Sequence, residues 1–342
     1  MIRVLVVDDS PTARALLVAI LGSDPEVQVV GEAVNGLEGV ELTRKLQPDI
    51  VTMDIRMPKM DGFEATKEIM IATPTPIVII TSSHAMHDVE TSMHALRAGA
   101  LSILEKPAGP GIPNFDETAQ QIIAHVKAMS QVKVVRHWRS TSPAVRAEPA
   151  PSRSSSRARV VAIATSTGGP AALHTLLSAL PADFASPILV VQHISVGFIR
   201  GLADWLNKVG HLQVKVAEEG ESLKKRTVYL GPDGCHLGVS ALGEVSLSAA
   251  PAIGGFRPSG THLFESVAKA YGNTAVALIL TGMGADGVAG LYAVRQAGSR
   301  IIAQDEKSCV VFGMPAVAIA ANLADEVLPL DEMAGRLIEL VV

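Results

Sequence analysis

Residues 2–22 read IRVLVVDDSPTARALLVAILG, and this stretch decides the fold of the N-terminal half. The apolar run Ile2–Val7 ends in two aspartates, and Pro11 then opens an amphipathic stretch. The same alternation continues to residue 129, with apolar runs at Val27–Val30, Asp49–Met53, Pro76–Thr81 and Leu101–Leu104 and helical patterns near 36–46, 62–72, 88–98 and 115–129. Strands that alternate with helices predict a parallel sheet covered on both faces. Five such units are typical of a flavodoxin-like, doubly wound (βα)5 domain.

The C-terminal half repeats this alternation on a larger scale. Its predicted buried strands are Val160–Ala164, Pro187–Gln192, Ala275–Leu280 and Ile301–Ala303. The segment 212–250 differs, because it has short apolar runs separated by turn residues such as GPDG at 231–234. We expect β-hairpins there, inserted in or added to the sheet. The second domain is therefore predicted to be a doubly wound, mostly parallel α/β domain with a β-hairpin region.

Between the two halves, composition changes sharply. Residues 140–159 read STSPAVRAEPAPSRSSSRAR, which contains no large apolar side chain that could anchor a core. Such a stretch is typical of an extended, solvated linker. From Gln131 to Arg159 there are seven Lys or Arg and one Glu, a net charge of +6, so a basic tether to an acidic partner is the alternative to a plain spacer. We predict domains at 1–130 and 159–342, joined by a linker at 131–158.

Length and composition exclude several classes of protein. The chain has 342 residues and a mass of 35.8 kDa, which suits two domains, and its net charge of −5 argues against a nucleic-acid-binding polycation. The mean hydropathy is +0.32, but the longest apolar stretch, Val310–Ala321, has 12 residues where a membrane span needs about 20. We expect no signal peptide at the N-terminus, because its apolar run is short and ends in two aspartates, and Cys235 and Cys309 are too few for a disulfide framework. We expect a reduced, cytoplasmic protein without membrane insertion.

Polar residues follow four of the five predicted strands of the N-terminal domain. They are Asp8 and Asp9, Asp54, Thr81 and Ser82, and Lys106. Carboxylates this close repel one another unless a cation intervenes, and a hard divalent ion with oxygen ligands, Mg²⁺ before Ca²⁺, would relieve that repulsion. One carboxylate could then act as a nucleophile toward phosphate, with Lys106 neutralising the phosphoryl oxygens. Capping of the first helix by Asp9 or Ser10 explains one of these residues but not the set.

The motifs at these strand ends support a family assignment. VVDDS at 6–10, MDIRMPKMDG at 53–62, TSS at 81–83 and KP at 106–107 resemble the phosphoacceptor receiver domain of bacterial two-component systems. The resemblance covers roughly residues 1–127. It implies that Asp54 is phosphorylated by a sensor histidine kinase and that Asp8, Asp9 and Asp54 hold Mg²⁺ with the backbone carbonyl of Arg56. It also implies that Thr81 is the switch hydroxyl and Lys106 the phosphate-pairing amine.

The C-terminal domain opens with a strand, a glycine-rich turn, TSTGGP at 165–170, and a predicted helix. This arrangement suits an anion, either a bound phosphate or the oxyanion beside a strand-end nucleophile. The dinucleotide fingerprint and the P-loop lysine are absent, and His193 and Asp286 follow neighbouring predicted strands. Ser166, His193 and Asp286 could therefore be nucleophile, general base and orienting acid. From spacing alone, His193 could equally be a buried core histidine and Asp286 a turn or helix cap.

Further motifs narrow this choice. TSTGGP, VVQH, ALILTGMGADG, AQDE and VVFGMPAVAI occur in order over residues 160–330. Together they resemble the catalytic domain of chemotaxis response-regulator protein-glutamate methylesterases. The resemblance implies a Ser166–His193–Asp286 triad, with the backbone N–H of Thr167 or Met283 stabilising the oxyanion. It implies hydrolysis of glutamate γ-methyl esters and deamidation of glutamine on methyl-accepting chemoreceptors, with no cofactor beyond the Mg²⁺ of the receiver.

One stretch departs from that pattern. Where the family resemblance leads us to expect Arg-Pro-Ser-Val-Asp, residues 257–262 read RPSGTH, so the acidic residue is missing. The departure leaves the triad intact and opens the question of which protein is the target. A non-hydrolysing receptor-binding scaffold and an esterase for a non-chemotaxis signalling protein are the alternatives. If the receiver covers the catalytic cleft, phosphorylation of Asp54 is expected to loosen that docking.

Overall fold

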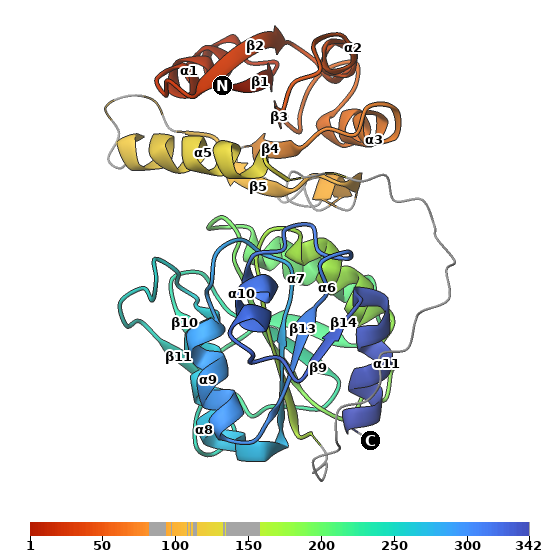
Figure 1. Cartoon of the computed structure of the whole chain (residues 1–342), viewed down its shortest axis with the longest axis vertical. Helices are drawn as coiled ribbons and strands as arrows, with labels where there is room; N and C mark the ends of the chain where they lie inside the picture. The colour runs from red at the N-terminus through yellow and green to blue at the C-terminus, as the bar shows by residue number, and fades with distance from the viewer. Residues whose placement is uncertain are drawn as a thin grey trace. The chain divides into compact units, whose positions relative to one another are not determined.

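The computed structural model describes residues 1–81, 94–96, 98–107, 109, 111, 115–132, 134 and 158–341 (Figure 1). Its contacts divide the chain into two compact units, Met1–Ser140 and Thr141–Val342. Ser82, most of the predicted helix at 88–98 and most of the predicted linker at 131–158 lie outside the described residues. Among the described helices, none combines the length and the apolar character needed to cross a bilayer.

The N-terminal unit is built on a five-stranded parallel sheet in the order β2-β1-β3-β4-β5. Its strands are β1 (Ile2–Val7), β2 (Val27–Ala33), β3 (Ile50–Met53), β4 (Ile77–Thr81) and β5 (Ser102–Glu105). Its helices are α1 (Pro11–Gly22), α2 (Gly36–Leu46), α3 (Gly62–Ala72) and α5 (Phe115–Met129). Helix α1 packs with α5, and α2 packs with α3. The doubly wound fold predicted for this half is confirmed.

Helix starts in this unit follow local capping chemistry. The side chain of Ser10 accepts a hydrogen bond from the N–H of Ala13, and Pro11 occupies the first helical position of α1. The carboxylate of Asp61 likewise accepts from the N–H of Glu64 at 2.8 Å and caps α3. Ser10 therefore caps α1, and Asp9 is left exposed beside the end of β1.

The C-terminal unit is built on a seven-stranded parallel sheet in the order β14-β13-β12-β6-β7-β9-β8. Its strands are β6 (Val160–Thr165), β7 (Ile188–Gln192), β8 (Gln213–Val216), β9 (Thr227–Leu230), β12 (Ala275–Ile279), β13 (Arg300–Gln304) and β14 (Glu326–Leu328). Its helices are α6 (Gly169–Ser178), α7 (Ile199–Asn207), α8 (Gly260–Tyr271), α9 (Val288–Gln296), α10 (Met314–Ala320) and α11 (Leu330–Val341), with a short 3-10 helix η1 (Gly272–Thr274). Figure 1 shows α8 and α9 on one side of the sheet and α6 and α11 on the other.

The prediction of hairpins over 212–250 is only partly right. One antiparallel pair forms there, β10 (His236–Val239) with β11 (Val245–Ser248). The rest of the segment supplies β8 and β9, which pair in parallel and extend the main sheet from β7. Each of these strands has only four residues, so their apolar patterns were too short to show which way they pair.

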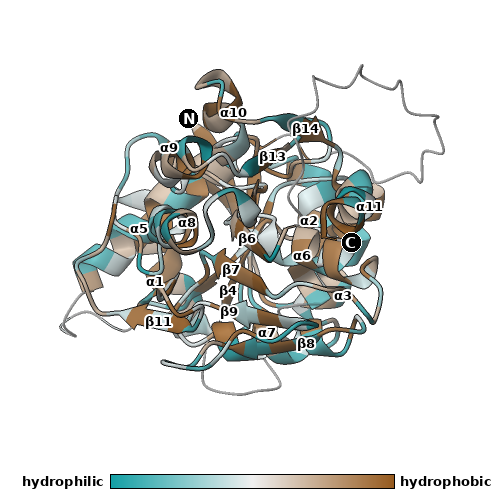
Figure 2. Cartoon of the chain, turned by 90° about the horizontal axis from the view of Figure 1, so that it is seen from below, coloured by the Kyte–Doolittle hydropathy of each residue, from teal (hydrophilic) through white to brown (hydrophobic). Residues whose placement is uncertain are grey.

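The core between the sheet and α8 uses small strand residues against large helix residues. Val160, Ala162 and Ala164 of β6 lie beneath Leu263 and Phe264 of α8, all of them fully buried. Figure 2 shows strands β6 and β7 coloured as hydrophobic. Burial of a side chain as large as leucine or phenylalanine contributes about 2 kcal/mol to the stability of the fold. The alanines let α8 approach the end of β6, which places the start of that helix beside the loop carrying Asp286.

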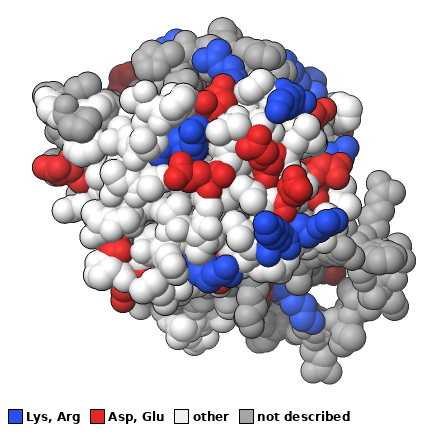
Figure 3. All heavy atoms as spheres, turned by 90° about the horizontal axis from the view of Figure 1, so that it is seen from above, with Lys and Arg blue, Asp and Glu red and all other residues white. Residues whose placement is uncertain are grey.

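Charged side chains are mixed on the face shown in Figure 3, where Lys and Arg lie between Asp and Glu. An interleaved surface of this kind does not concentrate one sign of potential on that face.

Candidate functional sites

The three residues expected to form a catalytic triad follow adjacent strands of the seven-stranded sheet. Ser166 comes directly after β6, and His193 comes directly after β7. Asp286 lies in the loop after β12, on the other side of β6. From β6 the chain winds toward β7 in one direction and later toward β12 in the other, so this is the topological switch point where α/β sheets bind ligands.

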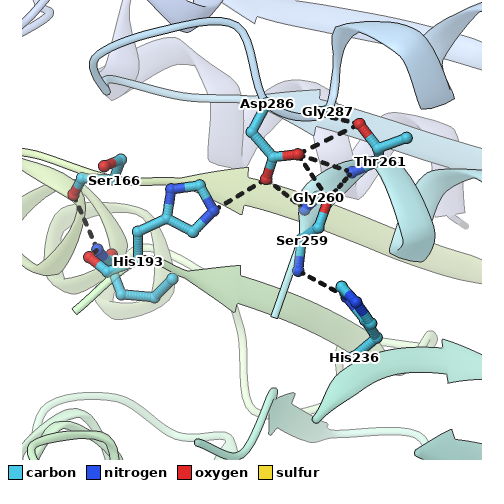
Figure 4. Close-up of polar contacts among 9 residues, drawn as sticks. Ser166, His193, His236, Ser259, Gly260, Thr261, Asp286 and Gly287 are labelled. Carbon is cyan, nitrogen blue, oxygen red and sulfur yellow. Dashed lines mark hydrogen bonds and ion pairs between the residues drawn. The ribbon is translucent and has the colours of Figure 1, made fainter. Parts of the chain in front are cut away.

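His193 and Asp286 form a direct hydrogen bond. The Nε2 atom of His193 lies 2.9 Å from Oδ2 of Asp286 (Figure 4). An ionised carboxylate can only accept, so Nε2 carries the proton and Nδ1 keeps its lone pair. Nδ1 is buried and has no hydrogen-bond partner among the described residues. The ring therefore presents a free basic nitrogen on the side away from Asp286.

Asp286 is held by four further hydrogen bonds from the start of α8. Its Oδ1 accepts from the hydroxyls of Ser259 and Thr261, at 2.6 and 3.2 Å, and from the N–H of Thr261 at 3.4 Å. Its Oδ2 accepts from the N–H of Gly260 at 2.6 Å. Burial alone would raise the pKa of Asp286, but hydrogen bonds from His193 and Ser259, with that of Gly260, lower it to about 2. Asp286 is therefore a carboxylate at neutral pH.

The stretch that departs from the expected family pattern is the stretch that binds Asp286. A Cβ on Gly260 would lie 2.7 Å from Cβ of Ala164, so a valine does not fit here without movement of β6. The hydroxyl of Thr261 donates to Asp286 and accepts from the N–H of Gly287 at 3.1 Å. The missing acid is thus replaced by a hydroxyl that supports the charge of Asp286.

Ser166 lies on the side of the imidazole ring away from Asp286, as Figure 4 shows. Its carbonyl accepts from the Gln192 side chain at 2.8 Å, and its N–H donates to the carbonyl of Thr281 at 3.0 Å. These bonds tie the turn after β6 to β7 and to the loop after β12. Among the described residues, no hydrogen bond joins the Ser166 hydroxyl to His193; in proteins without bound substrate such contacts are often long.

Two main-chain N–H groups belong to residues next to Ser166, one following it in the chain and one in the loop after β12. The N–H groups of Thr167 and Met283 make no hydrogen bond within the described part of the chain. Gly282 brings the second loop close, because a Cβ there would lie 2.7 Å from Cβ of Ser166. The hydroxyl of Thr281 also donates to the carbonyl of Thr167 at 2.9 Å and fixes that turn. Free N–H groups beside a serine suit a developing oxyanion.

The N-terminal unit has a second polar site at the end of its sheet. The Nζ atom of Lys106 lies 2.9 Å from Oδ2 of Asp8 and 2.9 Å from Oδ2 of Asp54. Burial raises the pKa of Asp54, with Lys106 opposing it. Burial works to lower the pKa of Lys106, but Asp54 and Asp8 outweigh it and raise that pKa. One oxygen each of Asp8, Asp9 and Asp54 lies within 4.8 Å of the others, a donor set that suits a hard divalent cation.

The other residues expected at this site lie around that cluster. Thr81 ends β4 and is buried, and its carbonyl accepts from the N–H of Lys106 at 2.9 Å. Arg56 is exposed two residues after Asp54. Outside the expected site, the ring of His94 stands edge-on to Phe63 of α3, at 5.9 Å between centroids.

Comparisons with known proteins agree with this geometry. The family described as CheB methylesterase matches residues 161–337, and the response regulator receiver domain matches residues 4–111. A protein-glutamate methylesterase/protein-glutamine glutaminase from Myxococcus xanthus is 55% identical over 339 residues, covering 98% of this chain and 96% of that protein. The chain belongs to the CheB methylesterase family. A relative of the same name in Anaeromyxobacter dehalogenans is 53% identical, with 98% of each chain covered.

A solved structure supports the same assignment for the C-terminal unit. The crystal structure of the Thermotoga maritima CheB methylesterase catalytic domain aligns with a TM-score of 0.53 and 41% identity. The alignment covers 54% of this chain and 99% of that domain. This CheB methylesterase family member thus combines the catalytic fold with a receiver domain.

Sequence reasoning missed the residues that hold the pair in place. Ser259 and Thr261 bind Asp286, and the ring of Phe256 stacks on His193 with 4.1 Å between centroids and 7° between planes. The sequence did show that residues 257–262 depart from the expected family motif, but it did not show that this stretch binds Asp286.

Proposed function

We propose that this chain hydrolyses glutamate γ-methyl esters and deamidates glutamines on methyl-accepting chemoreceptors, in chemotaxis adaptation. The observation that carries the proposal is the His193–Asp286 hydrogen bond beside Ser166, at the switch point of the sheet. The names of the relatives describe both activities, methylesterase and glutaminase. We place this work in the cytoplasm, where the receptor helices that carry such esters are reached.

The proposed reaction begins at Ser166. Its Oγ attacks the ester carbonyl carbon while Nδ1 of His193 takes the hydroxyl proton, and Asp286 stabilises the imidazolium that forms. The negative carbonyl oxygen of the tetrahedral intermediate accepts from the N–H of Thr167 or of Met283. The C–O bond to the methoxy group then breaks, and His193 returns the proton so that methanol leaves.

Water then hydrolyses the acyl-enzyme, and His193 again acts as general base and then as general acid. His193 takes a proton from the water as the water oxygen attacks the acyl carbon, and the bond to Ser166 breaks with return of the proton to Oγ. The product is a glutamate carboxylate. With a glutamine side chain the steps are the same, and ammonia leaves in place of methanol.

We propose that residues 1–130 form a receiver domain that controls this reaction. Residues 131–158 are the linker, and residues 159–342 are the catalytic domain. Asp54 takes a phosphoryl group from a sensor histidine kinase, and Lys106 pairs with the phosphoryl oxygens. Asp8, Asp9 and Asp54, with the carbonyl of Arg56, would hold Mg²⁺, which when bound neutralises charge on the phosphoryl oxygens. The hydroxyl of Thr81 forms a hydrogen bond with the phosphoryl group and so acts as the switch that responds to phosphorylation.

Regulation then follows from two states of the receiver. Unphosphorylated, it blocks access of the receptor to the catalytic cleft; phosphorylated, it releases that block. A preference of a few kcal/mol between the states suffices for such a switch.

The proposal that Ser166 is an activated nucleophile is tested by labelling with a serine-directed fluorophosphonate. Mass spectrometry of the digested protein is expected to find the adduct on the peptide containing Ser166, and His193→Gln is expected to lose it. A scaffold that binds receptors without hydrolysing them would stay unlabelled, and that result would overturn the proposal.

A further inference from the structure

A second histidine, His236, lies behind the catalytic pair and uses both of its ring nitrogens. It is fully buried at the start of β10. Its Nδ1 accepts from the N–H of Ser259 at 3.2 Å, and its Nε2 lies 3.0 Å from the carbonyl of Pro251 (Figure 4 shows the first bond). A carbonyl can only accept and an N–H can only donate, so these partners fix the neutral ring with its proton on Nε2.

The two partners of His236 are the two ends of one loop. Pro251 opens the loop and Ser259 closes it, so a single ring fastens both ends. At the tip, Ile253 and Phe256 exchange two main-chain hydrogen bonds across Gly254 and Gly255, both of which have positive φ. The loop is thus a tight hairpin attached to the buried ring of His236.

This loop contacts both members of the catalytic pair. Ser259 donates its hydroxyl to Asp286 at 2.6 Å, and Phe256 stacks on the imidazole of His193. A continuous chain of bonds therefore runs from His236 through Ser259 and Asp286 to His193, as Figure 4 shows. None of these links uses His236 as an acid, a base or a nucleophile.

We propose that His236 is a positioning residue of the hydrolytic site, which fixes the loop 251–259 so that Ser259 holds Asp286 and Phe256 covers His193. Because only Nε2 carries a proton, the ring can accept from Ser259 and donate to Pro251 at the same time. The kinetic test of this proposal rests on the proposed function. The structural test needs only the hydrogen bond between His193 and Asp286.

Three substitutions at His236 separate its two bonds. His236→Asn keeps an acceptor near the position of Nδ1, His236→Gln keeps a donor near the position of Nε2, and His236→Leu removes both. Because a small misplacement of catalytic groups can cost as much as about 100-fold, we expect His236→Leu to lower kcat by about 10- to 100-fold. KM for methylated receptor is expected to stay within about 3-fold of wild type, since His236 is fully buried. His236→Asn is expected to recover most of kcat, and His236→Gln to recover little.

The matched control is His262→Asn. His262 stacks on the ring of His236, with 5.0 Å between centroids, but among the described residues no hydrogen bond joins it to the chain of residues that leads to His193. We expect this variant to keep wild-type kcat, and thermal unfolding of every variant checks that the C-terminal unit remains folded.

A second readout does not depend on turnover. The imidazole proton that His193 shares with Asp286 should give a far-downfield proton NMR signal, present in wild type and His236→Asn and shifted or lost in His236→Leu. Folded His236→Leu with wild-type kcat and an unchanged signal would overturn the proposal, as would equal kcat losses in the Asn and Leu variants. If wild type releases no methanol while the signal still depends on His236, the proposed function fails and the positioning role stands.

Discussion

The Nε2 atom of His193 lies 2.9 Å from Oδ2 of Asp286, which leaves Nδ1 of the same ring as the free basic nitrogen. The carboxylate determines this choice, because it can only accept, so the ring nitrogen that faces it carries the proton. Hydrogen bonds from Ser259, Gly260 and Thr261 hold the carboxylate in that position. Asp286 thus fixes the tautomer and the direction of His193 together.

Asp286→Asn should therefore impair the chemical step far more than substrate binding. An amide oriented with its NH₂ toward His193 favours the proton on Nδ1, where it blocks proton transfer from Ser166. We expect kcat to fall by about 10³- to 10⁴-fold with little change in KM, measured by methanol release from methylated receptor. A loss below about tenfold would mean that Asp286 does not set the tautomer.

The lowered pKa of Asp286 predicts a pH-dependent contribution to stability. The pKa falls from 3.8 to about 2 on folding, so the folded state favours the charged form. The contribution, about 2 kcal/mol, is fully present above pH 4 and is lost as the pH falls toward 2. Urea unfolding of the C-terminal unit should show wild type more stable than Asp286→Asn at pH 6, with the difference shrinking below pH 4. A difference independent of pH would contradict the assignment.

Thr261→Val tests the hydroxyl that stands where an acid was expected. Valine keeps the shape but leaves Oδ1 of Asp286 and the N–H of Gly287 each without one partner, at a cost of about 1–3 kcal/mol. We expect lower stability of the C-terminal unit and a reduced kcat. Thr261→Ser, which retains the hydroxyl, is the control and should remain close to wild type. If the two variants behave alike, the hydroxyl has no role in holding Asp286.

Lys106→Met tests the ion pairs of the receiver. Asp8 and Asp54 are buried, so removal of the ammonium leaves two carboxylates close together with no cation. We expect a loss of about 3 kcal/mol or more for the N-terminal unit without Mg²⁺, partly restored by added Mg²⁺, and loss of activation by a phosphodonor. Lys127→Met removes an outer pair with Asp24 and should have a smaller effect. Equal stability losses in calorimetry with and without Mg²⁺ would argue against a metal at the aspartates.

The sequence predicted those parts of the molecule that depend on local pattern. Long buried runs such as Val160–Ala164 gave correct strands, and residues at their ends, including Ser166 and His193, reached the expected edge of the sheet. The four-residue strands β8 and β9 were mistaken for hairpins, because pairing direction depends on which strand lies beside them. The roles of Ser259 and His236 depend on contacts 27 and 23 residues away along the chain, which no local pattern encodes.

The central claim is that Ser166 hydrolyses receptor methyl esters under control of the receiver. It is tested most directly by methanol release from methylated receptor, with wild type and Ser166→Ala compared in Mg²⁺, each with and without a small phosphodonor. We predict that wild type releases methanol, that the phosphodonor raises the rate, and that Ser166→Ala releases none in either condition. Equal release by wild type and Ser166→Ala would contradict the account.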